Sequence, residues 1–317
     1  MTRVERRDEV TEQGQRRNLE RPPRPEPLPV AVVDNHCHLD VADGRTHLSL
    51  DDAISEAAAV GVTRIVQVGC DVDGSRWAVA TAEQHPSVVA AVAIHPNDAA
   101  RLGDDLPAAL AEIEALAAHP RVRAVGETGM DRFRTRDEAG IALQREAFAA
   151  HIALARTYGR ALVIHDRDAH DDVLDVLDAE GVPERLIMHC FSGDADFARA
   201  CLDRGAYLSF AGTVTFGNAQ PLRDALAIAP QDRILVETDA PYLTPAPFRG
   251  RPNASYLVPH TVRRMAEVRG VDLAELCAAI ATNTDAAFGG TWAEASSTVQ
   301  VDGQVGEPAE RRTDGAG

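Results

Sequence analysis

Histidine and carboxylate residues recur along this 317-residue chain in short motifs that have the types and spacing of metal ligands. His36 and His38 stand two residues apart in DNHCHLD, so in an extended chain both side chains project to one face and can hold one ion. The other ligand-type residues are Glu127 in GETGMD, His165 in IHDR, His189 in MHC and Asp239 in ETDAP. Imidazole and carboxylate together suit zinc, manganese, iron or cobalt, and are less natural for magnesium alone.

The size of this set indicates more than one ion. A histidine at the end of a strand is commonly a hydrogen-bonded structural residue, but this explanation does not extend to six ligand-type residues on five strand ends. Six ligands are too many for one tetrahedral site with an open position, and they suit two ions bridged by a carboxylate. We therefore expect two divalent ions per chain (magnesium, manganese or zinc), with Glu127 as the bridge.

All 32 basic residues are arginine, and the absence of lysine excludes several classes of protein. A P-loop of the GxxxxGK[ST] type cannot occur. Many barrel hydrolases with HxH on the first strand join two metals through a carboxylated lysine on the fourth. Here Glu127 stands at that position, which disfavours dihydroorotase-like and urease-like proteins.

Short apolar, β-branched runs alternate with alanine-rich amphipathic segments, and this rhythm predicts the fold. The expected strands are Val30–Asp34, Thr63–Gly69, Val88–Ile94, Val122–Glu127, Ala161–His165, Leu186–Cys190, Ala206–Phe210 and Ile234–Thr238. Eight strands with intervening helices predict a (β/α)8 TIM barrel of the metal-dependent hydrolase type. An open doubly wound sheet is the alternative, but the eight similar units and the lack of a glycine-rich dinucleotide loop favour closure. The ligand-type residues then fall at the C-terminal strand ends, where barrels carry their chemistry.

Composition divides the chain and limits its partners. We expect a disordered Pro/Arg-rich arm over 1–29, a barrel domain over 30–290 and a disordered tail over 291–317. A net charge of −17 excludes a generic cationic nucleic-acid binder. The five dispersed cysteines indicate reduced thiols and a cytoplasmic protein, and no apolar run is long enough to cross a membrane. No obligate protein partner is evident.

The motifs together resemble the TatD family of metal-dependent deoxyribonucleases. The matching segments are DNHCHLD at 34–40, IHP at 94–96, GETGMD at 126–131, LVIHDRDAHDD at 162–172, MHCFSG at 188–193 and ILVETDAPYL at 234–243. The resemblance implies that His36, His38 and Asp239 bind one metal. It implies that His165 and His189 bind the second, with Glu127 bridging, and that His95 and Arg167 contact substrate phosphate. Two departures are Arg132-Phe133-Arg134, where relatives carry aromatic residues, and Ala161 in place of proline.

The residues suggest a mechanism of hydrolysis. Divalent ions at such a site lower the pKa of a water and polarise a phosphoryl oxygen. Asp239 is the candidate general base, and Arg167 places a guanidinium near the scissile phosphate unless it pairs with Asp166 or Asp168. Ser192 is a further candidate phosphate contact. Cys37 lies between two ligands, and strand alternation turns it away from the metals.

The expected substrate is DNA, as single strands or 3′ ends. Arg132, Arg134, Arg249 and Arg251 are candidates for a small basic rim on an acidic body, which suits a strand end better than a long duplex. The resemblance implies a 3′–5′ exodeoxyribonuclease, and the direction of attack rests on it alone. The alternative is a two-metal hydrolase of another bond, such as an aminoacyl-tRNA ester, a lactone or an amide.

Overall fold

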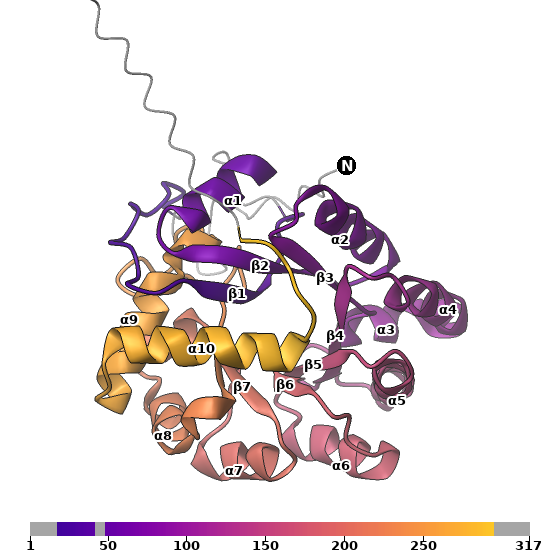
Figure 1. Ribbon diagram of the computed structural model, residues 1–317. Coiled ribbons are helices and arrows are strands. Elements are labelled where there is room, and N and C mark those ends of the chain that lie inside the picture. The colour runs from indigo at the N-terminus through magenta and orange to yellow at the C-terminus, as the bar shows by residue number, and fades with distance from the viewer. Residues whose placement is uncertain (1–17, 42–47, 295–317) are drawn as a thin grey trace, which may run out of the picture.

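An eight-stranded parallel sheet, in the order β1-β2-β3-β4-β5-β6-β7-β8, curls into a barrel at the centre of the molecule. The structure is a computed structural model and describes residues 18–41 and 48–294 (Figure 1). The strands are β1 (Val32–Cys37), β2 (Val62–Gly69), β3 (Val88–Val92), β4 (Val122–Asp131), β5 (Ala161–Arg167), β6 (Leu186–Met188), β7 (Tyr207–Phe210) and β8 (Ile234–Val236). The predicted TIM barrel is confirmed.

The barrel is closed between β8 and β1 by the chain just beyond β8. A β-bridge joins Cys37 to Ala240, the Asp239 N–H donates to the His36 carbonyl at 2.9 Å, and the His38 N–H donates to the Ala240 carbonyl at 2.8 Å. Two of the predicted ligand segments are therefore bonded to each other through their backbones.

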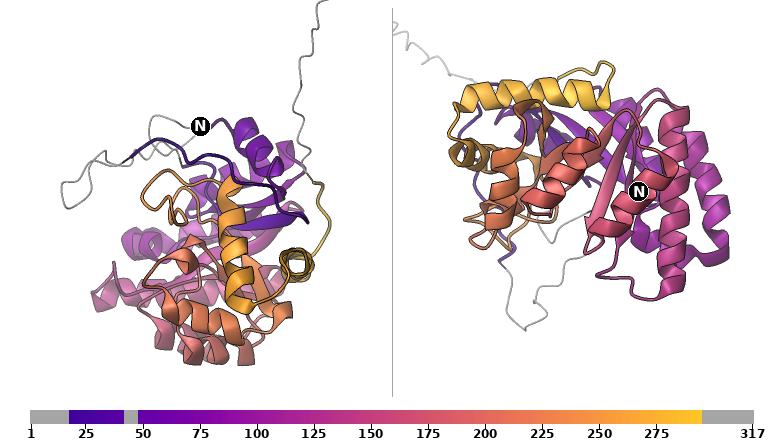
Figure 2. Two further views of the ribbon diagram at one scale, coloured as in Figure 1. Left: turned by 90° about the vertical axis from the view of Figure 1, so that its left-hand side faces the viewer. Right: turned by 90° about the horizontal axis from the view of Figure 1, so that it is seen from below.

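Helices surround the strands on the outside (Figures 1 and 2). They are α1 (Leu50–Ala58), α2 (Val72–Gln84), α3 (Pro96–Leu102), α4 (Leu106–Ala117), α5 (Glu138–Thr157), α6 (His170–Glu180), α7 (Ala195–Asp203), α8 (Gln220–Ile228), α9 (Val258–Arg269) and α10 (Leu273–Phe288). Aspartates at 71, 137, 194 and 272 cap α2, α5, α7 and α10 by accepting backbone N–H bonds. Within the described part of the chain, none of these helices has the length and apolar character needed to cross a bilayer.

Strand β4 is longer than predicted, and β6 and β8 are shorter. β4 continues past Glu127 to Asp131 because Gly129 permits a close approach to β5: its φ is +133°, and a Cβ there would lie 2.1 Å from the His165 carbonyl oxygen. β6 and β8 end at Met188 and Val236, so His189 and Asp239 lie in the loops just beyond their strands.

The described part of the N-terminal arm differs from the predicted disorder. Leu28 is buried, and its N–H donates to the Val60 carbonyl at 3.0 Å. Proline lacks an N–H but keeps its carbonyl, and the Pro22 carbonyl accepts from the Tyr256 hydroxyl at 2.7 Å. Arg24 forms an ion pair with Glu56 at 2.6 Å. Residues 18–29 are therefore bound to the barrel, while 1–17 lie outside the described residues.

The first residues of the predicted C-terminal tail contact the barrel. The Arg123 guanidinium donates to the Thr291 carbonyl at 3.2 Å, and the Trp292 ring packs against Phe288. The remainder of the predicted tail, from residue 295, lies outside the described residues.

Candidate metal centre

The C-terminal ends of five strands bring the six predicted ligands together around Glu127. His36 belongs to β1 and His38 follows it, Glu127 and His165 belong to β4 and β5, and the loops after β6 and β8 supply His189 and Asp239. All six side chains are at most 17% exposed. Their nitrogen and oxygen atoms face one another in the interior of the barrel end.

His36, His38 and Asp239 form the first cluster. Their side chains place His36 Nε2 3.3 Å from His38 Nε2, and Asp239 Oδ1 3.4 Å from His38 Nε2 and 3.9 Å from His36 Nε2. Two ligands bound at about 2.1 Å to one tetrahedral ion would lie about 3.4 Å apart. The three atoms therefore have the spacing of donors that share one ion.

The two carboxylate oxygens of Glu127 point to different neighbours. Oε2 lies 3.4 Å from His36 Nε2, on the side of the first cluster. Oε1 lies 2.5 Å from His165 Nδ1, 3.5 Å from His189 Nε2 and 3.5 Å from His95 Nε2. This division of the oxygens is what a bridging carboxylate requires.

His189 lies between the two sides rather than wholly with His165. Its ring stacks on His36 with a centroid separation of 3.5 Å, and its Nε2 lies 4.0 Å from Asp239 Oδ1. His189 can share an ion with His36 and Glu127, whereas His165 can share one with His95 and Glu127.

Neighbouring acceptors orient three of the imidazoles. His38 Nδ1 lies 3.1 Å from the Val68 carbonyl, and His165 Nε2 lies 3.3 Å from Asp131 Oδ2. These contacts leave His38 Nε2 and His165 Nδ1 with lone pairs for an ion. The third ring has a charged neighbour in place of a hydrogen-bonded one: His189 Nδ1 lies 2.8 Å from Glu237 Oε1.

His95 has the opposite arrangement. Its Nδ1 accepts the Asn97 N–H at 3.1 Å, so in the neutral ring the proton sits on Nε2, which faces Glu127 Oε1. This tautomer lets His95 donate a hydrogen bond, as a substrate contact would require, and disfavours the metal ligation beside His165 that its position alone would allow.

The charges of the centre call for cations. Burial alone would raise the pKa of Glu127, but His189 and His95 hold it well below its usual range. Burial alone would lower the pKa of His165 and His189, but neighbouring carboxylates raise both to about 9. Among the described residues, no arginine pairs with Glu127 or Asp239. Buried carboxylates that face imidazoles and no guanidinium group fit divalent ions, which would replace these protons.

Of the predicted substrate contacts, Arg167 and Ser192 lie at the edge of the centre. The Arg167 guanidinium stacks on the Phe133 ring at 3.9 Å from the ring centroid. Burial raises the pKa of the Cys190 thiol, next to His189, and the charge of Arg167 opposes this rise. No ion pair joins it to Asp166 or Asp168 within the described residues. The Ser192 hydroxyl donates to the Asp166 carbonyl at 3.2 Å.

Some arginines of the predicted basic rim are bound to other parts of the protein and are not free to contact substrate. Arg132 pairs with Asp172, and Arg251 donates to the Arg21 carbonyl at 2.7 Å, so both guanidinium groups have protein partners. The Arg249 guanidinium stacks on the Phe216 ring at 4.4 Å.

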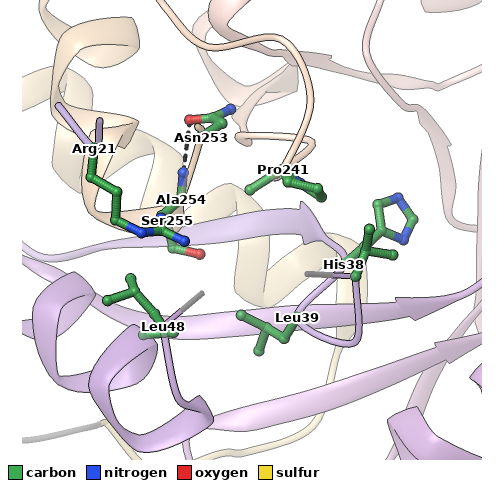
Figure 3. A pocket seen from close by; sticks show the side chains of 11 residues that line it. Arg21, His38, Leu39, Leu48, Pro241, Asn253, Ala254 and Ser255 are labelled. Carbon is green, nitrogen blue, oxygen red and sulfur yellow. Dashed lines mark hydrogen bonds between the residues drawn. The ribbon is translucent and has the colours of Figure 1, made fainter. Parts of the chain in front are cut away.

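An open pocket, whose empty space of about 390 Å³ includes open solvent, adjoins the first cluster (Figure 3). His38 lies on one side of it and Arg21 on another, with Leu39, Leu48 and Pro241 among the apolar lining residues. The pocket therefore offers an apolar surface next to a predicted metal ligand.

Sequence reasoning assigned no role to three residues that contact the ligands: Asp131, Glu237 and Cys70. Strand alternation could have indicated Asp131 and Glu237, which lie an even number of residues from Glu127 and Asp239. Glu237 accepts from the Cys190 N–H at 2.7 Å and from the Ser209 hydroxyl at 2.6 Å. Cys37, as predicted, faces away from the centre, with its sulfur 3.8 Å from the Val66 carbonyl.

A parallel barrel with buried histidines and carboxylates at its C-terminal end defines the class of metal-dependent hydrolases. The model of the family "TatD related DNase" matches residues 33–289. This chain therefore belongs to the TatD family. It is 48% identical over 264 residues to "Uncharacterized metal-dependent hydrolase TatD" of Mycobacterium tuberculosis, covering 82% of this chain and 99% of that protein. It is 38% identical over 259 residues to YabD of Bacillus subtilis, covering 81% and 98%.

Solved structures agree with this assignment. The TatD homologue YJJV of Escherichia coli superposes with a TM-score of 0.73 at 27% identity, covering 81% of this chain and 97% of that chain. A TatD-family hydrolase from Entamoeba histolytica gives a TM-score of 0.70 at 17% identity over 84% and 99%. The second likeness, at this identity, is one of fold.

Proposed function

We propose that this protein is a deoxyribonuclease that hydrolyses phosphodiester bonds from the 3′ end of single-stranded DNA, using a centre of two divalent ions. The observation that carries the proposal is the division of the Glu127 oxygens between the His36 side and the His165 side. The family model supports a nucleic-acid substrate. Residues 30–290 form the hydrolase domain.

In this proposal, His36, His38 and Asp239 would hold the first ion, His165 and His189 would hold the second, and Glu127 would join the two sides. Magnesium, manganese or zinc at these positions, when bound, supplies Lewis acidity to water and to the phosphoryl oxygen. Asp239 has the second most exposed side chain of the six, at 14%, after His165 at 17%, so solvent reaches its carboxylate. Asp239 accepts the proton of the attacking water.

The remaining candidates bind the substrate. The Arg167 guanidinium pairs with the scissile phosphate, and the Nε2–H group of His95 donates a hydrogen bond to a phosphate oxygen. The Ser192 hydroxyl is a further donor to phosphate.

A strand end suits this site better than a duplex. The chain carries a net charge of −17, which repels a long polyanion, and few arginines near the centre are free of protein partners. All five cysteines are free thiols, which supports a cytoplasmic location. The proposal requires no protein partner.

The test is a nuclease assay on metal-stripped protein to which magnesium, manganese or zinc is added back. Single- and double-stranded DNA labelled at either end reports both cleavage and its direction. Glu127→Ala removes the bridging carboxylate, and Glu112→Ala, an exposed carboxylate paired with Arg76, is the matched control. We expect stepwise shortening from the 3′ end that needs metal, persists in the control and is lost in Glu127→Ala.

The opposite result has a specific meaning. A wild-type protein that binds two ions and leaves all DNA intact would contradict the nuclease proposal. The same metals would then serve another bond, and aminoacyl-tRNA esters, lactones and amides would be the next substrates to assay.

A further inference from the structure

A sixth strand end, that of β2, brings the Cys70 thiol to the metal centre. Cys70 follows β2 directly, and its sulfur lies 3.8 Å from His38 Nδ1 and 3.9 Å from Glu127 Oε2. Cys70, His38 and Glu127 have ligand atoms within 4.8 Å of one another. The sulfur therefore stands on the same side of Glu127 as the first cluster.

The backbone on both sides of Cys70 is fixed. The Cys70 carbonyl accepts the His95 N–H at 2.8 Å. Gly69 packs so closely on α2 that a Cβ there would lie 2.4 Å from the Ser75 backbone, and Asp71 caps α2 by accepting the Gly74 N–H at 2.7 Å. The hydrogen bonds and close packing at the turn between β2 and α2 therefore fix the position of the thiol.

The other thiols have different surroundings. Cys37, Cys201 and Cys277 belong to the apolar core. Cys190 lies near His189 and Glu237, and its N–H is bound to Glu237. Among the described cysteines, Cys70 alone shares a group of possible ligands with the proposed bridging residue Glu127.

We propose that Cys70 is a sulfur ligand of the ion held beside Glu127 Oε2, which gives this side of the centre nitrogen, oxygen and sulfur donors. On binding, the S–H bond breaks, a sulfur–metal bond forms and the proton passes to solvent. Thiolate prefers zinc and cobalt to magnesium and manganese, so the thiol selects the metal. The inference rests on the metal centre of the proposed function and adds a ligand to it.

The test is a titration of the metal-free protein with cobalt(II), followed by absorption spectroscopy. A sulfur ligand gives a near-ultraviolet thiolate-to-cobalt band, whereas nitrogen and oxygen ligands give only the weaker visible bands. We expect both kinds of band in the wild type. Cys70→Ser should keep the visible bands and lose the near-ultraviolet one, and Cys190→Ala, the matched thiol control, should keep both. The zinc affinity of Cys70→Ser, measured by chelator competition, should fall about tenfold or more, with little change for manganese.

The outcomes separate the two proposals. Visible bands without a near-ultraviolet band in the wild type would overturn the sulfur ligand and leave the metal centre intact. A near-ultraviolet band that survives in Cys70→Ser and disappears in Cys190→Ala would also overturn it. No visible bands in any folded variant would contradict the metal centre itself, and circular dichroism verifies folding in each case.

Discussion

His36 Nε2 and His38 Nε2 lie 3.3 Å apart, with Asp239 Oδ1 within 3.9 Å of both. Two imidazole nitrogens at this distance repel each other if both present lone pairs. A single proton between them removes this repulsion but leaves one of the two nitrogens without a partner for Asp239. Burial and the neighbouring His189 lower the pKa of His36, so protonation of this ring is unfavourable. A cation between the two nitrogens is the arrangement that satisfies all three side chains.

Glu237→Gln should weaken metal binding without unfolding the protein. The Glu237 carboxylate lies 2.8 Å from His189 Nδ1 and orients the ring from behind. Glutamine can still accept the Cys190 N–H through its single oxygen and can donate its amide group to the Ser209 oxygen, but it carries no charge. Loss of such a charged partner typically reduces metal affinity about 10–100-fold. Chelator competition measures the affinity, with Asp178→Asn, an exposed carboxylate, as the control. An affinity equal to that of the wild type would show that Glu237 is only structural.

Arg167→Gln should reduce kcat/KM for DNA by about 10–100-fold while leaving the metal content unchanged. The expected loss corresponds to one charged hydrogen bond, about 1.5–3 kcal/mol. Arg199→Gln, a change at an exposed arginine on α7, provides the control. Steady-state kinetics on a short labelled oligonucleotide, together with elemental analysis, measures both quantities. Unchanged kinetics would remove Arg167 from the substrate contacts and leave it as the stacking partner of Phe133.

His151 should make the protein sensitive to acid. Its ring is fully buried, with Nε2 accepting the Ile94 N–H and Nδ1 2.8 Å from the Thr128 hydroxyl, and burial lowers its pKa to about 3. The unfolded chain takes up this proton near pH 6.5, so the unfolded state binds more protons between pH 6.5 and 3. As the pH falls through this window, the contribution of His151 should therefore lower the free energy of unfolding by about 1.4 kcal/mol per pH unit.

Urea unfolding of the wild type and His151→Gln between pH 5 and 7.5 isolates this contribution. The difference between the two curves should be flat above pH 6.5 and should slope below it, with the wild type losing more stability. Parallel curves throughout the range would mean that His151 is not held neutral in the folded protein.

The arm should stabilise the barrel mainly through Leu28. Leu28→Ala removes a buried side chain and should lower the free energy of unfolding by about 2–4 kcal/mol. Arg24→Ala breaks an ion pair in which the Arg24 side chain is 44% exposed, and should cost at most about 1 kcal/mol. Urea unfolding compares the two variants. Equal, small losses would show that residues 18–29 contribute little to the stability of the barrel.

The barrel and the six candidate ligands follow from local patterns. A run such as Val88–Val92 is apolar on both faces, as parallel strands covered by helices require, and polar residues appear where such runs end. The lengths of the strands were less predictable, because β4 continues past Glu127 through a close approach of Gly129 to β5, and that contact depends on tertiary structure.

The surroundings of the ligands could not be derived in the same way. Nothing in the sequence distinguishes a carboxylate that faces an ion, such as Asp239, from one behind an imidazole, such as Glu237. The two differ only in their positions relative to the rings in the folded barrel. Cys70 lies in no recognisable motif, and its approach to Glu127 results from the pairing of β2 with β3 and the turn into α2. The composition of residues 18–29 predicts disorder, but these residues are bound to the barrel because their proline carbonyls remain acceptors for arginine and tyrosine.

The most direct measurement is a crystal structure of the zinc-loaded protein, with anomalous data collected on both sides of the zinc absorption edge. Two anomalous peaks should appear at ligand distance from Glu127, one on the side of His36 and His38 and the other on the side of His165. A single peak, or two peaks that do not contact Glu127, would contradict the bridged two-ion centre on which the proposed mechanism depends.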